Sequence, residues 1–462
     1  MRPSTALALA RPASIADRGR FALISGSTAL AGALLLAALH ILRLPTIESG
    51  SAEPPAPGLA NYVTEGGLRA GVVIAALLLT VPVFALAVQA LRVGSVARDR
   101  RMASLRLAGA TPRDVRTIAA VEAGGAAVAG GLLAGPAYLL LWLLAGVLPP
   151  AGARMLATPD ALDLLAWAAV VPLAGIAGVL AGAALHGRTI VEPLGVRRRA
   201  RPAAPGRSNL AGLIAGVALV LVSVVVFPTV ASHGAGELGV LLAAIFGLLL
   251  AAFAGGPRLV LGYAHVIERR HGVEALLAHR RLQADPRSAG RVAGVLFVCG
   301  VALGVEALLI AEQLSQSGFG GGDGFYLVGY GMTAIVVLVA AAVALLTLLV
   351  GAADGLLDAR RSLATLAALG VDARMLERVV GRQLSASAVP AAAAGAFVGA
   401  PAIVMLGGIS VGMPFLLATV LVPASIAALT AALVTAVGAR LSARLLRSLI
   451  RSAVDPENLR VA

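Results

Sequence analysis

Ten long apolar runs constrain the fold of this chain more than any other feature of its sequence. A helix needs about 20 mostly apolar residues to cross a bilayer. Only 13% of the residues are charged, against about 25% in a soluble domain, so a soluble fold could not cover its surface with polar groups. The sequence therefore predicts an all-α polytopic membrane protein with about ten transmembrane helices, at residues 20–42, 69–93, 117–147, 161–186, 209–231, 237–257, 290–311, 328–352, 376–406 and 412–437.

The arginines predict how these spans are oriented. All 37 basic residues are arginines. With the N-terminus in the cytoplasm, 34 of them fall in cytoplasmic segments, and only Arg43, Arg69 and Arg154 fall outside. Positive charge accumulates on the cytoplasmic side of membrane proteins, so we expect a multi-pass protein of the bacterial plasma membrane with both termini cytoplasmic. The cytoplasmic clusters should also contact anionic membrane lipids.

The absence of lysine excludes one kind of catalytic site. A P-loop uses a lysine to reach the β- and γ-phosphates of ATP, so any ATP hydrolysis must come from another chain. The single cysteine, Cys299, excludes an internal disulfide and a cysteine-cluster metal site. The six histidines show no paired metal spacing. Aromatic residues make up only 4% of the chain, which argues against a nucleic-acid partner. We therefore predict no enzyme activity, cofactor or metal.

A short segment occurs twice, at a fixed offset along the chain. The first copy spans residues 100–115 and follows the second predicted span, and the second copy spans 361–375 and follows the eighth. The offset pairs Arg100 with Arg361, Ala103 with Ala364, Leu105 with Leu366, Gly109 with Gly370, Arg113 with Arg374 and Glu122 with Gln383.

The repeated segment predicts a short amphipathic helix, a sharp turn and a long helix that re-enters the bilayer. Gly109 and Gly370 stand where a glycine ends a helix. Thr111-Pro112 then reads as the cap and first residue of the next helix, and Asp372 can cap its counterpart. Such a short cytoplasmic helix can present its outer face to a soluble partner.

The duplication also predicts how the chain is organised. We expect a four-span repeat at 1–190, a linker with two spans at 191–274, a second four-span repeat at 275–450 and a cytoplasmic tail at 451–462. Because two linker spans leave both repeats pointing the same way, a pseudo-two-fold axis along the membrane normal follows.

The repeated segment resembles the FtsX-like permease family of ABC transporters, which includes macrolide-exporter and bacitracin-type permeases. The family pattern is a basic stretch, a short helix of the type E-[LI]-A-L-L-R-A-L-G-A-T, then R-x-[VI] and a helix with an early acid. Here Leu105, Arg106, Gly109 and Arg113 stand in place, with Glu122 as the later acid. The stretch 278–287 also looks like the family's elbow helix. The acid that usually opens the short helix is replaced by Arg101 and Ser362, and no large extracellular domain is present.

The resemblance implies that the short helices dock onto a separate ABC ATPase, a dimer for each permease, which binds the ATP. The expected ATPase-coupling residues are Arg100, Arg101, Leu105, Arg106, Gly109, Arg113, Arg361, Leu366, Gly370 and Arg374. The function implied is ATP-driven efflux, or extraction from the membrane, of a hydrophobic or amphipathic substrate.

Three of the polar residues inside the predicted spans are candidates for a role within the membrane: Glu122, Glu306 and Gln383. Glu122 is expected to pair with a nearby arginine such as Arg113 or Arg116, with Gln383 as its polar counterpart. Two interpretations of Glu306 are open. It is either an interfacial acid near the outside water, or a contact for a cation or proton, since a charge inside a span is costly and usually functional. The second interpretation leaves ion-gradient-driven secondary transport as an alternative function. A membrane-embedded enzyme would need a converging reactive cluster, and the sequence shows none.

Overall fold

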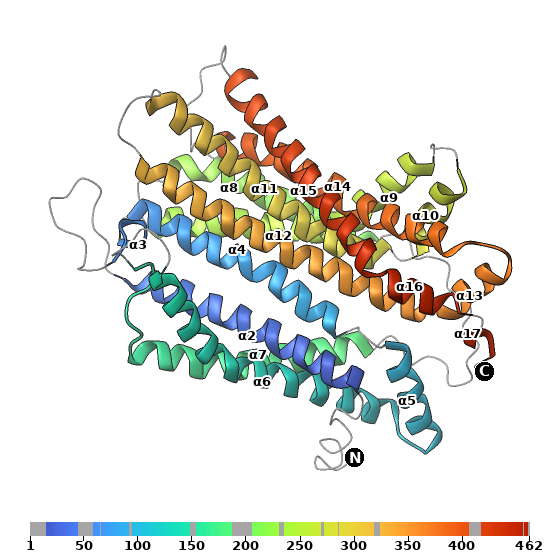
Figure 1. Cartoon of the computed structure of the whole chain (residues 1–462). Helices are drawn as coiled ribbons and strands as arrows, with labels where there is room; N and C mark the ends of the chain where they lie inside the picture. The colour runs from blue at the N-terminus through green and yellow to red at the C-terminus, as the bar shows by residue number, and fades with distance from the viewer. Residues whose placement is uncertain are drawn as a thin grey trace. The chain divides into compact units, whose positions relative to one another are not determined.

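The computed structural model describes most of the chain, in twelve stretches. These are residues 15–44, 59–64, 66–91, 95–147, 154–186, 206–230, 235–268, 272–284, 286–317, 324–405, 417–455 and 457–460. Within them the elements are helices, apart from an isolated bridge between Leu59 and Arg154. Ten of these helices are long and apolar enough to cross a membrane. The prediction of an all-α polytopic membrane protein is confirmed (Figure 1).

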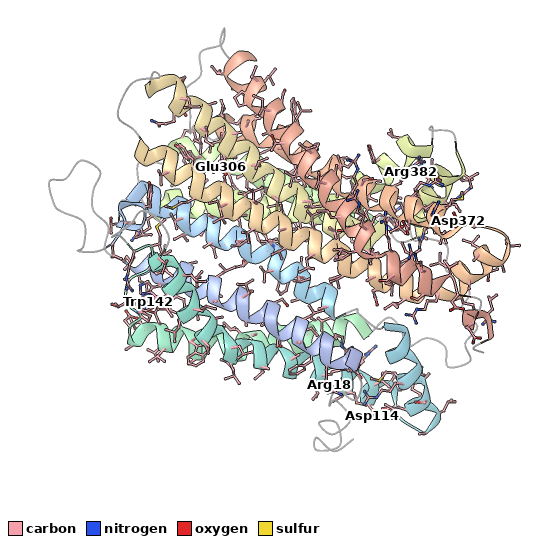
Figure 2. The ribbon with its side chains drawn as sticks, in the orientation of Figure 1. Arg18, Asp114, Trp142, Glu306, Asp372 and Arg382 are labelled. Atoms are coloured by element: carbon pink, nitrogen blue, oxygen red, sulfur yellow. The ribbon has the colours of Figure 1, made fainter. Side chains whose placement is uncertain are left out.

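The chain divides into two compact units, Met1–Arg199 and Ala200–Ala462. Unit 1 contains α2 (Ile15–Arg43), α3 (Asn61–Thr64), α4 (Gly66–Ala90), α5 (Ser95–Leu107), α6 (Pro112–Val147) and α7 (Ala161–His186). In this unit α2 packs on both α4 and α6, and α6 packs on α7. One core, which includes Ala33, Leu36, Val63 and Tyr138, lies where α2, α3, α4 and α6 meet. Figure 2 shows Arg18 and Asp114 at one end of the unit and Trp142 at the other.

Unit 2 contains the remaining elements. They are α8 (Arg207–Val230), α9 (Ala235–Glu268), α10 (Val273–Ala284), α11 (Pro286–Ser317), α12 (Gly324–Asp358), α13 (Arg360–Ala368), α14 (Ala373–Met405), the π-helix η4 (Leu417–Leu421), α15 (Val422–Leu445), α16 (Arg447–Ala453) and α17 (Glu457–Arg460). Here α11 packs on α12 and α14, and α14 packs on α15, in the same pairwise order as α2, α4, α6 and α7 in unit 1. The two predicted linker spans, α8 and α9, pack on each other, and α9 packs on α11.

Glycines set the distance between α11 and α14. Gly300 and Gly304 on α11 and Gly395 and Gly399 on α14 face the partner helix, and a Cβ at any of them would collide with a backbone carbonyl oxygen of that partner. The spacing of four residues in each helix is the small-xxx-small pattern of close packing in membranes. By contrast, Gly331 on α12 has no atom within 4 Å of an added Cβ. The two helices α11 and α14 are therefore in backbone contact.

Several predicted spans end too early. The sixth, now α9, was expected to end at residue 257 but continues through Pro257 to Glu268, and the tenth was expected to end at 437 but its helix α15 continues to Leu445. The proline lies against α11, where a Cβ at Gly290 would collide with its backbone. A transmembrane helix can contain a proline where a neighbouring helix packs closely against it, and α11 packs in this way beside Pro257.

Candidate functional site

The turn between α5 and α6 has a defined hydrogen-bond pattern. The N–H of Gly109 donates to the carbonyl of Arg106 (3.0 Å), and the N–H of Ala110 donates to that of Leu105 (3.0 Å). Gly109 has a φ of +97°. Together these features are a Schellman motif, in which a glycine with positive φ ends the helix and two otherwise unpaired carbonyls are satisfied.

The turn between α13 and α14 repeats this pattern. The N–H of Gly370 donates to the carbonyl of Ala367 (2.9 Å), and the N–H of Val371 donates to that of Leu366 (3.1 Å). Gly370 has a φ of +93°. Each of these positions lies 261 residues after its counterpart in the first turn. The duplicated sequence therefore adopts the same local structure twice, and both predicted glycine turns are present.

The long helix after the first turn begins with a capping box. α6 starts at Pro112, and the N–H of Thr111 donates to the Asp114 carboxylate (2.9 Å) while the N–H of Asp114 donates to the Thr111 hydroxyl (3.2 Å). This reciprocal pair satisfies two backbone donors at the start of the helix. In the second copy the backbone carbonyl of Asp372 accepts from Met375 (3.0 Å) and Leu376 (3.2 Å), so α14 begins at the equivalent place.

Each turn exposes one large apolar side chain. In the first hairpin Leu105 packs against Met102, Val115 and Ile118, which fix α5 onto α6. Leu107, two residues before Gly109, is 81% exposed. In the second hairpin Leu363 is buried and Leu369, next to Gly370, is 77% exposed. Exposed leucines beside a structured turn suit an apolar contact with another protein.

The predicted coupling residues surround these turns. Arg113, Arg361 and Arg374 are exposed, and Arg101, Arg106, Leu105 and Leu366 are half-buried. Arg100 lies within α5, and its side chain is outside the described residues. Each hairpin therefore carries an exposed leucine together with exposed arginines.

Ion pairs tie the start of α14 to its neighbours. The carboxylate of Glu274 on α10 accepts from Arg378 and Arg382 of α14, each at 3.0 Å. Glu377 of α14 pairs with Arg447 of α16 at 3.0 Å. α13 also packs on α16. These contacts connect the start of α14 to α10 and α16.

Glu122 has a different partner from the one predicted. Its carboxylate pairs with the guanidinium of Arg20 on α2, and both side chains are largely withdrawn from solvent. Arg113 and Arg116 are exposed instead. The predicted structural role for Glu122 within an ion pair is thus supported, but the pair joins two spans rather than two turns of one helix. Its counterpart Gln383 is half-buried on α14.

Glu306 on α11 is buried, with 5% of its surface exposed. Neither of its carboxylate oxygens has a hydrogen-bond partner among the described residues. The backbone of Ala334 on α12 lies near enough to interact with it electrostatically. Figure 2 shows Glu306 toward the opposite end of unit 2 from Asp372 and Arg382. Its carboxylate is therefore enclosed by the protein.

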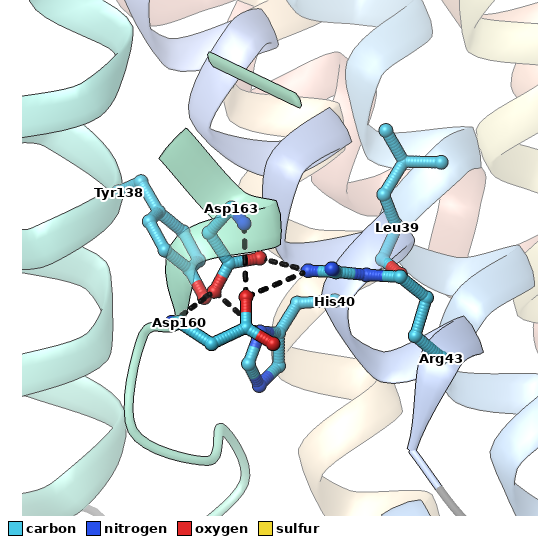
Figure 3. A network of polar contacts seen from close by, with 6 residues as sticks. All are labelled: Leu39, His40, Arg43, Tyr138, Asp160 and Asp163. Atoms are coloured by element: carbon cyan, nitrogen blue, oxygen red, sulfur yellow. Dashed lines mark hydrogen bonds and ion pairs between the residues drawn. The ribbon is translucent and has the colours of Figure 1, made fainter. Parts of the chain in front are cut away.

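A polar network in unit 1 was not predicted (Figure 3). Asp163, at the start of α7, receives the Arg43 guanidinium on one carboxylate oxygen. Its other oxygen accepts from His40 Nδ1 (2.7 Å), the Asp160 N–H (3.0 Å) and the Tyr138 hydroxyl (3.5 Å). The N–H of Asp163 donates back to the Asp160 carboxylate (2.9 Å). The network thus joins α2, α6 and the start of α7.

Three of these side chains could also hold a metal ion, since ligand atoms of His40, Asp160 and Asp163 lie within 4.8 Å of one another. However, both Asp163 oxygens already accept hydrogen bonds, and Arg43 brings a positive charge to both carboxylates. The hydrogen bond from the Asp163 backbone holds the pKa of Asp160 below its ordinary value. The residues therefore fit a structural clamp better than a metal site.

Comparisons with known proteins identify no related protein. No protein-family model matches this chain, and searches of curated proteins and of solved structures find no match either. The two hairpins and the buried charged groups are therefore the features of this chain that bear on its function.

Proposed function

We propose that this protein is the membrane subunit of an ABC transporter, located in a bacterial plasma membrane with both termini cytoplasmic. The observation that carries the proposal is the pair of matched hairpins, α5–α6 and α13–α14. Both end their short helix with a Schellman turn, at Gly109 and Gly370, and both expose a leucine beside it. Under the offset of the repeat, Leu369 lies one position beyond the counterpart of Leu107, so one soluble protein present in two copies could bind both hairpins through similar contacts.

The proposed mechanism is mechanical. A separate ATPase dimer binds Leu107 and the arginines of the first hairpin with one subunit, and Leu369 and the arginines of the second hairpin with the other. Closure of the dimer on ATP displaces both hairpins. The ion pairs of Glu274 and Glu377 pass the motion from α14 to α10 and α16. The expected outcome is export, or extraction from the membrane, of a hydrophobic or amphipathic substrate.

The experiment is purification of the tagged full chain from its native membranes in mild detergent, with mass spectrometry of stoichiometric partners. An ATPase with a Walker A motif should co-purify with the wild type and be lost from the double variant Leu107→Ser/Leu369→Ser. Because both leucines are exposed, this variant should fold normally. Leu445→Ser is the matched control, since Leu445 at the end of α15 is 69% exposed but lies on neither hairpin. Absence of any ATPase from the wild-type preparation would overturn the proposal.

A second candidate function is transport driven by an ion gradient, and the burial of Glu306 is the observation that favours it. Such transporters place ionisable groups inside the membrane. They also use broken helices near the midplane, whereas α11, which carries Glu306, is continuous from Pro286 to Ser317. We therefore rank this function second.

A further inference from the structure

Glu306 combines burial with the lack of a partner. It lies nine residues before Ser315, the last residue of its span, so its Cα is about 14 Å from that end of the apolar segment. Its side chain is 5% exposed, and neither carboxylate oxygen finds a hydrogen-bond donor among the described residues. An ionised carboxylate in such a place has a large desolvation cost unless a positive group joins it.

The sequence places no basic residue near Glu306 on α11 or on α12. The chain has no lysine, and no arginine occurs between Arg291 and Arg360 or between Arg382 and Arg440. Along α11, Arg291 is fifteen residues away, or about 22 Å. Of the helices that pack on α11, neither α12 nor α15 has a basic residue within the outer half of its described part. The charged residue nearest to Glu306 in sequence is another acid, Glu312, on the same helix.

The surroundings also disfavour a small inorganic cation. Sodium or calcium would need several oxygen ligands around it. The neighbouring positions on α11 and α12 are mainly Ala, Val, Leu and Ile. An organic cation with an apolar body would satisfy both the carboxylate and these walls.

Movement of α12 away from α11 could expose Glu306. α11 is held against α14 by the four glycines at backbone contact, whereas it packs on α12 less extensively. Separation of α12 from α11 would therefore uncover Glu306 while α11 and α14 stayed together.

We propose that Glu306 is the anionic contact for the positively charged group of an amphipathic organic cation, which binds between α11 and α12. This inference deepens the proposed transport function and depends on it for the direction in which the cation moves. Binding itself needs no ATPase. A binding measurement on the purified chain can therefore fail or succeed independently of the ATPase co-purification.

The test is equilibrium binding of radiolabelled tetraphenylphosphonium, a permanent lipophilic cation, to the full chain in phosphatidylcholine nanodiscs. We expect saturable binding to the wild type. Loss of one partner of a buried charge pair is costly, so Glu306→Gln should weaken the affinity on the order of 30-fold or more. Glu306→Asp should retain part of it. Glu312→Gln, the same change two turns along α11, should leave the affinity within about twofold, as expected for a charge outside the contact.

A second measurement avoids substitution altogether, in case Glu306→Gln does not fold. Dicyclohexylcarbodiimide, an apolar reagent that modifies carboxyl groups in membrane interiors, should label Glu306 in the wild type, as mapped by mass spectrometry. Tetraphenylphosphonium should protect Glu306 from labelling, and neutral triphenylphosphine oxide should not. Equal affinity of wild type and Glu306→Gln, no saturable binding by the wild type, or labelling without protection would each overturn the proposal. The last result would point to proton binding alone.

Discussion

The guanidinium of Arg20 on α2 and the carboxylate of Glu122 on α6 form an ion pair that joins two spans of unit 1. Arg20 is 5% exposed, so removal of Glu122 leaves a buried positive charge with only the more distant Asp17 carboxylate, at 4.0 Å. We predict that Glu122→Gln lowers the free energy of unfolding by about 3 kcal/mol. Unfolding in mixed micelles would measure this. A loss no larger than that caused by Arg113→Gln, an exposed arginine nearby, would contradict the prediction.

The contact between α11 and α14 predicts that alanine substitutions at different glycines change stability in opposite directions. Gly300→Ala should force the helices apart, because its Cβ would collide with the carbonyl oxygen of Ala392. Overpacking of this kind costs about 1–3 kcal/mol. Gly331→Ala on α12 meets no atom within 4 Å, and alanine favours a helix by about 1 kcal/mol over glycine. Thermal unfolding in detergent should therefore move in opposite directions for the two variants, and a shared direction would refute the packing argument.

The Schellman turns predict a graded response to substitution. Gly109 has a φ of +97°, which asparagine tolerates better than a β-branched residue does. Gly109→Val should cost about 1–2 kcal/mol and reduce the amount of co-purified ATPase, and Gly109→Asn should cost less and retain it. The same order is expected at Gly370. Proteolysis rates at the turn, measured beside the pull-down, separate local unfolding from loss of a contact.

The clamp in unit 1 predicts a response to acid. Because the hydrogen bond from Asp163 lowers the pKa of Asp160, the ionised Asp160 stabilises the fold at pH values above the unfolded pKa of about 3.9. That stability is lost as the pH falls through the lower folded pKa. In a Trp142→Phe background, Trp167 on α7 is the remaining tryptophan and reports on this helix through its hydrogen bond to the Gly131 carbonyl (2.9 Å).

We expect the Trp167 emission to change reversibly below about pH 4, where the Asp160 carboxylate becomes protonated. Asp160→Ala should show a smaller acid transition, because the group that titrates is gone. An unchanged transition in Asp160→Ala would contradict this prediction.

The sequence predicted features that depend on local pattern and failed on pairings between distant segments. The ten spans followed from the length of the apolar runs, and the turns at Gly109 and Gly370 followed from the repeated motif. The Arg20–Glu122 pair was missed because the two residues are about a hundred positions apart and the nearer Arg113 and Arg116 looked equally suitable. The continuation of α9 through Pro257 depends on how α11 packs, which no local rule reveals.

The clamp of His40, Arg43 and Asp163 was also missed because it joins segments that are distant in sequence. His40 and Asp163 lie 123 residues apart in sequence, and nothing in either neighbourhood indicates the other. Part of the network could nevertheless have been found. Asp160 and Asp163 precede an apolar run at the spacing of a capping box, so the start of α7 was open to prediction although its partners on α2 were not.

The glycine contacts between α11 and α14 join the two helices into a single rigid unit. Because no side chains separate their backbones at these four positions, no soft layer there can absorb a displacement. A small shift of Gly370 would reach the level of Glu306 with little attenuation. The displacement would then be taken up at the contact with α12, so that α12 moves relative to the α11–α14 pair while that pair stays together.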